Sequence, residues 1–600
     1  MVYETEQAPL VFIVLYYCIV LACLRGVGLV AGYIAAAVLH GPRQGGRVLG
    51  KVVWELAVDW LQTSPRRVLA LSMLAFRESI RRKVLYAFGV LLVFFLLAGW
   101  FLDDRGDRAA AMYLNLAMFS TTMLIVIMAV VLSCFSLPAD FQDRTIFTIV
   151  SKPVRRHEIV LGRVIGFTFT GTILLTCMGV VSYLFVINGL SHEHVLRDYE
   201  IKTVDLDETE ENPLVHRGKT IQEHGHRHEV YFHQDGTAEA DDLAGHTHDV
   251  RQNKENGKLT ASLGATRRML RARIPLYGTL QFFDREGKAK NKGINVGKEW
   301  GYRGCVEGGN ESRAVWTFHG VTKDHFSQGF LPLELTLGVF RTYKGQVDAG
   351  IAGSIQLENP TTGRTTNPRT FVAREYYTDR INIPEQLESA DGPVSLFDED
   401  PSKALVDPKG NLIITVRCED RAQFYCMAQH DLSLRAGDTF FEWNFFKGHI
   451  GVWLQLVLAI VIGVTCSTFL RGPVAMCLTF GVIGGGHFTK FMHSVSTGQL
   501  EGGGPLESVI RIYINLAPVI ALPDSEWVNW VQMFDQLMKQ GVYVAGHLVP
   551  DFVAYNQSDF VARGYNIDPG VLTMNVLGAA AYVIPAIIIG HLCLKLRQVG

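Results

Sequence analysis

Histidine is concentrated in one part of the chain: nine of the 19 histidines lie between residues 192 and 248. Imidazole nitrogens bind Zn²⁺ and Cu²⁺, and alternate side chains of an extended segment project to the same side. Nearby carboxylates, such as those of Glu223 and Asp241, offer oxygen ligands. The segment 192–248 therefore predicts a site for Zn²⁺, Cu²⁺ or Ni²⁺. Its candidate ligands are His224, His226, His228, His246 and His248.

Two other interpretations of these histidines remain open. A solvated, flexible loop tolerates histidine without binding anything. Histidine also titrates close to neutral pH, so the same group would suit a pH sensor.

A second candidate site is the charged stretch 140–163, which separates two long apolar runs. Residues 140–150 have the spacing of a short amphipathic helix that Pro153 ends, and a second helix is expected to begin near Arg156. A short, rigid, charged helix suits the docking of a partner protein. The alternative is an ordinary turn whose arginines only set membrane orientation. The candidate docking residues are Asp140, Asp143, Arg144, Lys152, Arg155, Arg156 and Glu158.

The composition places both candidates in a large membrane protein. The 600 residues include 56 Lys and Arg and 58 Asp and Glu, which gives a net charge of -2 and excludes a predominantly basic nucleic-acid binder. Charged residues make up 19% of the chain and its mean hydropathy is +0.17, which argues against disorder. Ten cysteines in a chain of this length do not indicate a disulfide scaffold.

Seven apolar runs are long enough, or nearly so, for the roughly 20-residue helix that a bilayer requires. We interpret the first as one long or broken helix, and the acidic residues Glu4 and Glu6 ahead of it argue against a signal peptide. The runs are 8–42, 84–102, 109–139, 164–191, 450–470, 472–489 and 569–594.

The charges between these runs predict an orientation. Residues 41–83 carry nine Lys and Arg against three Asp and Glu, and residues 140–163 carry five against three. By the positive-inside rule these segments and the C-terminus are cytoplasmic, in an inner (plasma) membrane. The N-terminus and the segments 192–447 and 496–568 are then expected outside.

The segments outside the apolar runs have distinct patterns. Residues 43–83 have the spacing of interfacial amphipathic helices, and 506–522 and 527–537 predict short helices. The segment 192–447 alternates apolar and polar residues between turn signals, as in a β-sandwich. Cys418 and Cys426 in that segment are either disulfide-bonded or two free thiols. Its expected strands include 277–282, 314–318, 333–337 and 412–418.

The stretch from residue 140 to 166, DFQDRTIFTIVSKPVRRHEIVLGRVIG, resembles the signature of type-2 ABC transporter permeases. Residues 76–90 are similar to that family's interfacial helix and first span, and residues 549–564 to its external stretch before the last span. The resemblance covers 64–191 and 448–600. The residues matching the signature are Arg144-Thr145, Lys152-Pro153-Val154, Arg156, Glu158, Gly162 and Arg163, the last replacing a usual lysine.

The resemblance implies a six-span permease, paired with a second copy or a paralogue, whose loop 140–158 docks a separate ATP-binding subunit. ATP would be hydrolysed by that partner, so this chain is expected to be no enzyme and to hold no nucleotide itself. The chain agrees, because Gly218-Lys219-Thr220, the one phosphate-loop lookalike, has Pro213 where the motif needs glycine.

The expected fold class is an α-helical polytopic membrane protein with an inserted extracytoplasmic β-sandwich-like domain. The expected function is transport, in the direction of export, and no nucleic acid is expected as a partner. The alternative is a membrane-anchored extracytoplasmic sensor or metal-binding surface protein. In chain order the expected parts are an N-terminal span (1–42), interfacial helices (43–83), three core spans (84–191), the β-rich domain (192–447), two core spans (448–495), external helices (496–568) and the last span with its tail (569–600).

Overall fold

The computed structural model divides the chain into two compact units. The helical unit comprises Met1–Leu270, Glu442–Arg563 and Ile567–Gly600, and the β unit comprises Arg271–Phe441 with Gly564–Asn566. The structure describes residues 30–596 except 31, 35–36, 39–40, 82–84, 99–100, 103–108, 197–200, 204–213, 224–225, 242–245, 256–257, 268, 291, 297–302, 324–329, 343–349, 374–377, 391, 399, 401–402, 499–502, 518–519, 521 and 523–524.

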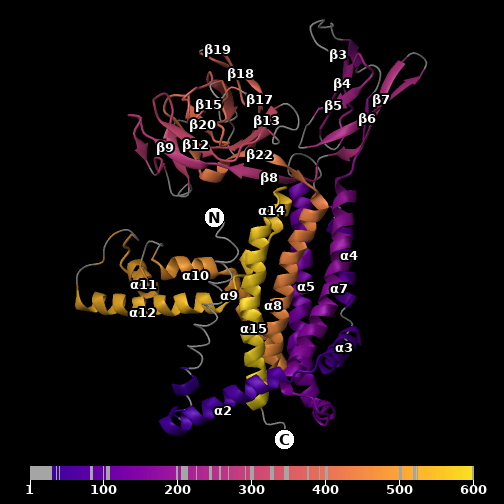
Figure 1. Cartoon of the computed structure of the whole chain (residues 1–600), viewed down its shortest axis with the longest axis vertical. Coiled ribbons are helices and arrows are strands. Elements are labelled where there is room, and N and C mark those ends of the chain that lie inside the picture. The colour runs from indigo at the N-terminus through magenta and orange to yellow at the C-terminus, as the bar shows by residue number, and fades with distance from the viewer. Residues whose placement is uncertain are drawn as a thin grey trace. The chain divides into compact units, whose positions relative to one another are not determined.

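The helical unit is built on long apolar helices that run side by side (Figure 1). Within the described residues, four helices are long and apolar enough to cross a membrane. They are α5 (Ala109–Gln142), α7 (Arg156–Leu190), α8 (Phe441–Phe469) and α15 (Pro569–Leu596). These four confirm the apolar runs 109–139, 164–191, 450–470 and 569–594 as helices of membrane-crossing length.

The other predicted spans are shorter or lie outside the described residues. Helix α4 (Leu85–Ala98) has 14 residues and α9 (Gly472–His487) has 16, below the usual length of a spanning helix. Most of the run 8–42 falls among residues that are not described.

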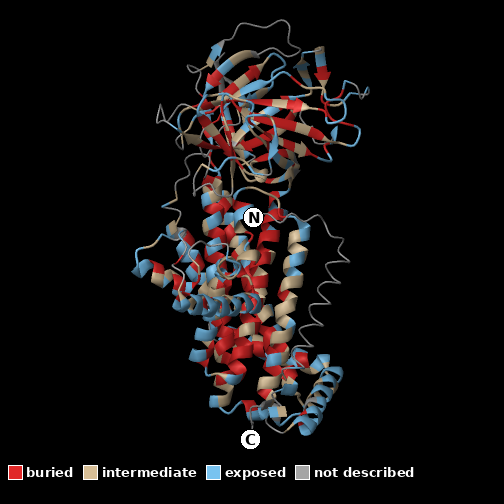
Figure 2. Cartoon of the chain, turned by 90° about the vertical axis from the view of Figure 1, so that its left-hand side faces the viewer, coloured by how far each residue is buried: buried red, intermediate tan, exposed pale blue. Residues whose placement is uncertain are grey.

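Small residues let the long helices of the bundle approach closely. A Cβ at Gly463 of α8 would lie 2.0 Å from the Ser133 hydroxyl of α5, so the backbone of α8 packs directly against this small side chain. The Thr121 and Ser182 hydroxyls hydrogen-bond at 2.9 Å between α5 and α7. Figure 2, in which the ribbon is coloured by burial, shows buried residues along the centre of the bundle.

Shorter helices flank the bundle, and among them are the amphipathic helices that the sequence predicted for residues 43–83, 506–522 and 527–537. Residues 43–83 form two helices, and the predicted helices 506–522 and 527–537 correspond to a shorter α11 and a longer α12. The flanking helices are α2 (Pro42–Leu61), α3 (Pro65–Arg81), α6 (Ile146–Val150), α10 (Thr489–Ser496), α11 (Pro505–Tyr513), α12 (Glu526–Leu548), α13 (Phe552–Tyr555) and α14 (Ser558–Ala562).

Two small sheets follow α7 and belong to the helical unit. One has the strand order β1-β7-β6 and the other β2-β3-β4-β5, with antiparallel neighbours throughout. Leu196, Val230, Phe232, Ala261 and Leu263 form a core of their own. The strands are β1 (His194–Leu196), β2 (Ile201–Thr203), β3 (Leu214–Lys219), β4 (Glu229–His233), β5 (Ala238–Ala240), β6 (Thr247–Glu255) and β7 (Lys258–Arg267).

The β unit has two main sheets around one apolar core. Their orders are β10-β9-β12-β20-β15-β16 and β17-β13-β22-β8, with smaller sheets β11-β21-β14 and β18-β19. Inward-facing residues of both main sheets, including Trp316, Leu333 and Ile414, share the core. The strands are β8 (Ala272–Tyr277), β9 (Thr279–Phe283), β10 (Ala289–Lys290), β11 (Gly304–Glu307), β12 (Arg313–Phe318), β13 (Phe330–Thr336), β14 (Gly338–Arg341), β15 (Ile351–Glu358), β16 (Arg369–Ala373), β17 (Thr378–Pro384), β18 (Gln386–Ser389), β19 (Gly392–Ser395), β20 (Leu412–Cys418), β21 (Gln423–Met427) and β22 (Leu432–Thr439).

Two expectations for the β-rich segment need correction. The segment 192–447 is divided at residue 270, because the sheets that follow α7 have their own small core. Cys426 is bonded to Cys305, which lies directly opposite it where β11 pairs with β21. Cys418 is a buried free thiol at the end of the neighbouring strand β20.

Candidate functional site

The turn between α5 and α7 presents an exposed tip. The expected helix over 140–150 is interrupted, because α5 continues to Gln142 and α6 covers only Ile146–Val150. Arg144 has φ 58°, a left-handed conformation that ends one helix before the next begins. The side chains of Asp143, Arg144 and Lys152 are exposed, and that of Phe147 is 45% exposed.

The base of this turn is held by a buried arginine. Arg163 of α7 is 5% exposed and forms ion pairs with Asp140 of α5 and, at 3.2 Å, with Glu78 of α3. The Ser136 hydroxyl of α5 donates to Glu78 at 2.9 Å, and the Thr145 hydroxyl donates to Asp140 at 2.8 Å. Arg163 therefore joins α3, α5 and α7 at the base of the turn, and Asp140 is bound within the chain instead of facing a partner.

Glu158 is enclosed by hydrogen-bond donors at the start of α7. It has no exposed surface and accepts from Arg67 Nη2 at 2.7 Å, from Arg67 Nε at 2.8 Å and from the Ser64 backbone N–H at 2.9 Å. The Arg155 N–H also donates to it at 3.0 Å and so caps α7. This is a correction to the expected docking surface, because a carboxylate so enclosed positions α3 against α7 and cannot contact a partner directly.

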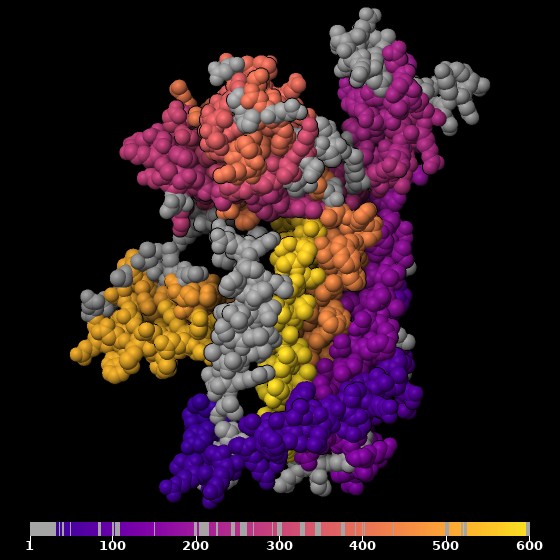
Figure 3. Space-filling view, viewed as in Figure 1, coloured from indigo at the N-terminus to yellow at the C-terminus, as the bar shows by residue number. Residues whose placement is uncertain are grey.

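Arg155 and Arg156 also bind within the chain. Arg155 pairs with Asp59 of α2 at 2.5 Å, and Arg156 donates to the backbone carbonyls of Leu594 and Lys595 at the end of α15. Figure 3 shows α2 lying across this end of the bundle, where Lys595 also pairs with Glu55 at 2.7 Å. These contacts tie α2, α7 and α15 together.

Asp59, His157 and His591 lie close enough to share a metal ion at this end of the bundle. Asp59 is already paired with Arg155 and Lys595, while His157 Nε2 hydrogen-bonds the Thr63 hydroxyl at 2.8 Å. Because two cationic side chains already neutralise this carboxylate, the group is better suited to joining helices than to binding a cation.

Helix α3 is seated on α7 through two glycines. A Cβ at Gly162 would lie 2.4 Å from the Leu71 Cβ, and one at Gly166 would lie 2.5 Å from the Ser72 carbonyl oxygen. Only glycine permits this approach. The tip, its ionic base and α3 therefore form one closely packed assembly.

The second site is a cluster of six histidines in the small sheets that follow α7. Of the predicted ligands it contains His226, His228, His246 and His248, while His224 lies outside the described residues. His226 Nε2 lies 3.2 Å from the Nε2 atoms of His194 and His246. His192 Nε2 is 3.1 Å from that of His246, and His228 Nε2 is 3.2 Å from it. The residues of this six-histidine cluster are His192, His194, His226, His228, His246 and His248.

The fold supplies these ligands as three His-x-His pairs. The pair 192/194 joins α7 to β1, the pair 226/228 precedes β4, and the pair 246/248 begins at the start of β6. Sequence reasoning missed His192 and His194 as ligands. Their signal was the same His-x-His spacing at residues 192–194, but proximity to the other pairs arises only when β1 pairs with β7 and β7 with β6.

The cluster is largely shielded from water. His194 and His228 have no exposed surface, and His246 and His248 are 1% and 4% exposed. Burial, together with the neighbouring imidazoles of His226 and His228, lowers the pKa of His194 to about 3. A histidine in this environment is neutral at physiological pH, the state in which imidazole binds a metal ion.

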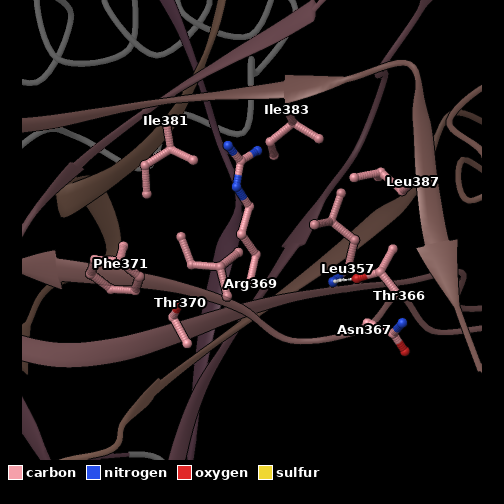
Figure 4. A pocket seen from close by; sticks show the side chains of 10 residues that line it. Leu357, Thr366, Asn367, Arg369, Thr370, Phe371, Ile381, Ile383 and Leu387 are labelled. Atoms are coloured by element: carbon pink, nitrogen blue, oxygen red, sulfur yellow. Dashed lines mark hydrogen bonds between the residues drawn. The ribbon is translucent and has the colours of Figure 1, made fainter.

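Neither of two cavities found among the described residues has the features of a substrate pocket. A cavity of about 30 Å³ in the β unit holds about one water molecule, and Figure 4 shows Ile381, Ile383 and Leu387 around Arg369 there. An opening of about 780 Å³ between α10 and α12 is wide open to the surroundings, and its lining includes Gln532, Asp535 and Lys539. Small-molecule sites are usually more enclosed.

Comparison of the chain with family models, curated proteins and solved structures gives no significant match. The function must therefore be argued from these sites.

Proposed function

We propose that this chain is the membrane subunit of an ABC transporter and acts with a separate ATP-binding subunit. In this proposal α4 and α9 complete a six-span core with the four long helices. The turn between α5 and α7 faces the cytoplasm, and the small sheets that follow α7 lie outside. The direction of transport is export, and two such subunits form the membrane pore.

The observation that carries the proposal is the exposed tip on a rigid base. Arg144, Phe147 and Lys152 offer a basic and aromatic surface of the kind that anchors protein interfaces. Directly beneath them, Arg163 and Asp140 join α7 to α5. Because the base is rigid, a displacement of the tip would move both α5 and α7.

The contacts of α3 extend this path. Glu78 and Arg67 of α3 bind Arg163 and Glu158 of α7, so α3 must move with α7. In alternating access, groups of helices move as rigid bodies against one another, so helices within one group must stay together. The assembly of α3, α5 and α7 is suited to convert closure of a partner into movement of the bundle.

The experiment compares the wild-type chain with two matched double variants, each gently purified from its native membrane. R144E/F147A alters the tip, and K490E/F491A makes the same changes on α10, where Lys490 and Phe491 are also exposed. We expect an ATP-binding subunit to co-purify stoichiometrically with the wild type and the α10 variant, and to be lost from the tip variant. Absence of such a subunit from wild-type preparations, or its full retention by the tip variant, would overturn the proposal.

The second candidate function is a membrane-anchored metal-binding or sensor protein. The six-histidine cluster favours it, since a buried group of imidazoles needs no transport partner to bind a metal ion. The purification separates the two functions. An ATPase-free preparation that still carries a metal ion supports the anchored protein and contradicts the permease.

A further inference from the structure

We propose that the six-histidine cluster is an octahedral site for one divalent first-row transition-metal ion of the Mn²⁺, Fe²⁺, Co²⁺ and Ni²⁺ group. The site is formed by residues of this chain alone. The inference goes beyond transport and stands whether or not the chain pairs with an ATP-binding subunit.

The arrangement of the six rings is that of an octahedron. Every ring is in edge contact with all the others except one, with centroids 4.7–5.2 Å apart and interplanar angles of 68–90°. In an octahedron each vertex likewise adjoins every other vertex except the one opposite. The opposite pairs here are His192 with His228, His194 with His246, and His226 with His248.

The distances between the Nε2 atoms agree with this geometry. Six nitrogens bound at about 2.1 Å, the usual metal–imidazole distance, would lie about 3.0 Å apart along the edges of an octahedron. The observed Nε2–Nε2 distances are 3.1–3.3 Å, and all join ring pairs that the octahedron places side by side. The spacing of these Nε2 atoms therefore matches that of nitrogens bound to one shared metal ion.

Three Nδ1 atoms, which face away from the cluster, have hydrogen-bond partners that leave the Nε2 lone pairs of their rings directed to its centre. His192 Nδ1 lies 3.2 Å from the Leu190 carbonyl oxygen and His248 Nδ1 lies 2.6 Å from that of Gly264. His228 Nδ1 lies 2.9 Å from Asp241 Oδ1. An acceptor at Nδ1 requires that this nitrogen carry the proton, so a neutral ring presents an unprotonated Nε2.

Converging lone pairs need a positive charge between them. His248 Nε2 is buried and has no hydrogen-bond partner among the described residues, although its ring faces the cluster. A buried polar atom without a partner costs free energy, and a metal ion at the centre would satisfy it together with the other lone pairs. Metal-bound histidines commonly have the outer hydrogen bonds seen here.

The number of ligands selects among metals. Zn²⁺ in structural sites takes four ligands, which would leave two of the six imidazoles unused, and Cu²⁺ prefers a tetragonal arrangement. Six equivalent nitrogens suit ions that accept regular octahedral coordination. Of the three ions expected from the sequence, this geometry favours Ni²⁺ over Zn²⁺ and Cu²⁺, and it adds Mn²⁺, Fe²⁺ and Co²⁺.

The experiment uses the full-length chain, purified in detergent with a tag that contains no histidine and stripped of metal with a chelator. Co²⁺ and Ni²⁺ are added, bound metal is measured by elemental analysis, and the Co²⁺ form is examined by visible absorption. We expect one ion per chain and the weak absorption of six-coordinate Co²⁺. Intense bands of four-coordinate Co²⁺, two ions per chain, or no bound ion would overturn the proposal.

Single variants test one ligand that the sequence predicted, His248, and one that it missed, His192. We expect H192A and H248A each to weaken Ni²⁺ binding by more than about 100-fold, since even loss of an outer hydrogen bond costs 10–100-fold. The matched control is H233A, because His233 lies on β4 and pairs with Glu239 outside the cluster. Circular dichroism of the metal-free variants checks folding, and unchanged Ni²⁺ affinity of a folded H192A variant would contradict the six-ligand site.

Discussion

The guanidinium of Arg67 donates from two nitrogens to Glu158, a carboxylate that lies 91 residues away in the sequence and has no exposed surface. The same carboxylate accepts from the N–H groups of Ser64 and Arg155. Glu158 thus links the start of α3 with the start of α7. Because α7 begins directly after the exposed tip, this link fixes α3 to the helix that holds one side of the tip.

Removal of Arg67 should destabilise the helical unit, because it leaves the buried Glu158 carboxylate without its cationic partner. We expect R67A to lower the melting temperature in detergent by roughly 5 °C or more, while E158Q has a smaller effect because the amide still accepts hydrogen bonds. In the R67A/E158Q double variant the second change should partly restore stability. Strictly additive effects of the two changes would contradict a direct pairing.

The contact of α3 with α7 should tolerate no added methyl group at Gly162. G162A places a Cβ 2.4 Å from that of Leu71, so one helix must shift, at a cost of about 1–3 kcal/mol. The matched control is G481A in α9, where a Cβ meets no atom within 4 Å and alanine should stabilise the helix by about 1 kcal/mol. Thermal unfolding of both variants measures this difference, and equal stability would show that α3 is not closely packed on α7.

The sequence predicted the local elements of this fold better than its pairings. Strand β20 (Leu412–Cys418) and the long helices α5 and α7 follow directly from alternation and from apolar length. The start of α7 at Arg156 was also predictable, because Pro153 cannot continue the preceding helix. These features depend on neighbours within a few residues.

Contacts between distant segments could not be read from one sequence. The burial of Glu158 depends on Arg67, and the six-histidine cluster depends on β1 and β6 flanking β7. The sequence identified four of the six clustered histidines, but the same His-x-His spacing at His192 and His194 could not show that these two lie beside the others. The same limit explains the cysteine error, since Cys305 is 121 residues from Cys426.

The Cys305–Cys426 disulfide should contribute substantially to the stability of the β unit. It closes a long loop, and removal of such a bond typically costs 2–5 kcal/mol. We expect C305A/C426A to lower the unfolding free energy by about that amount, whereas C418A acts only through packing. Burial raises the pKa of Cys418 to about 12, so this thiol should resist alkylation until the unit unfolds. Peptide mapping checks the pairing, and a peptide in which Cys418 is bonded to Cys426 would contradict it.

The carboxylate of Asp407 should make the β unit sensitive to acid. Burial would raise its pKa, but N–H groups of Asn411 at 2.7 and 2.8 Å and of Lys409 at 2.9 Å outweigh burial and lower the pKa below its ordinary value. A lowered native pKa stabilises the fold above the unfolded pKa of about 3.8, and this gain is lost as the pH falls through the native value. We expect D407N to be less stable than wild type at pH 6 and to lose less stability towards pH 3. Parallel pH profiles of the two proteins would contradict this role.

Metal removal should destabilise the helical unit. The stability that bound Ni²⁺ adds should be smaller when the Asp241 carboxylate is replaced. At a free Ni²⁺ concentration 100 times the Kd, binding stabilises the folded state by about 2.7 kcal/mol, so the chelated protein should melt at a lower temperature. D241N weakens the hydrogen-bond acceptor at His228 Nδ1 and should reduce Ni²⁺ affinity about 10-fold. At the same Ni²⁺ concentration, the stabilisation by bound metal should then be smaller by about 1.4 kcal/mol. The matched control is D235N, because Asp235 lies in the turn after β4 and binds Thr237. Calorimetry with and without Ni²⁺ measures all three proteins. A metal-dependent shift that is the same in D241N and wild type would show that this outer hydrogen bond does not orient a ligand.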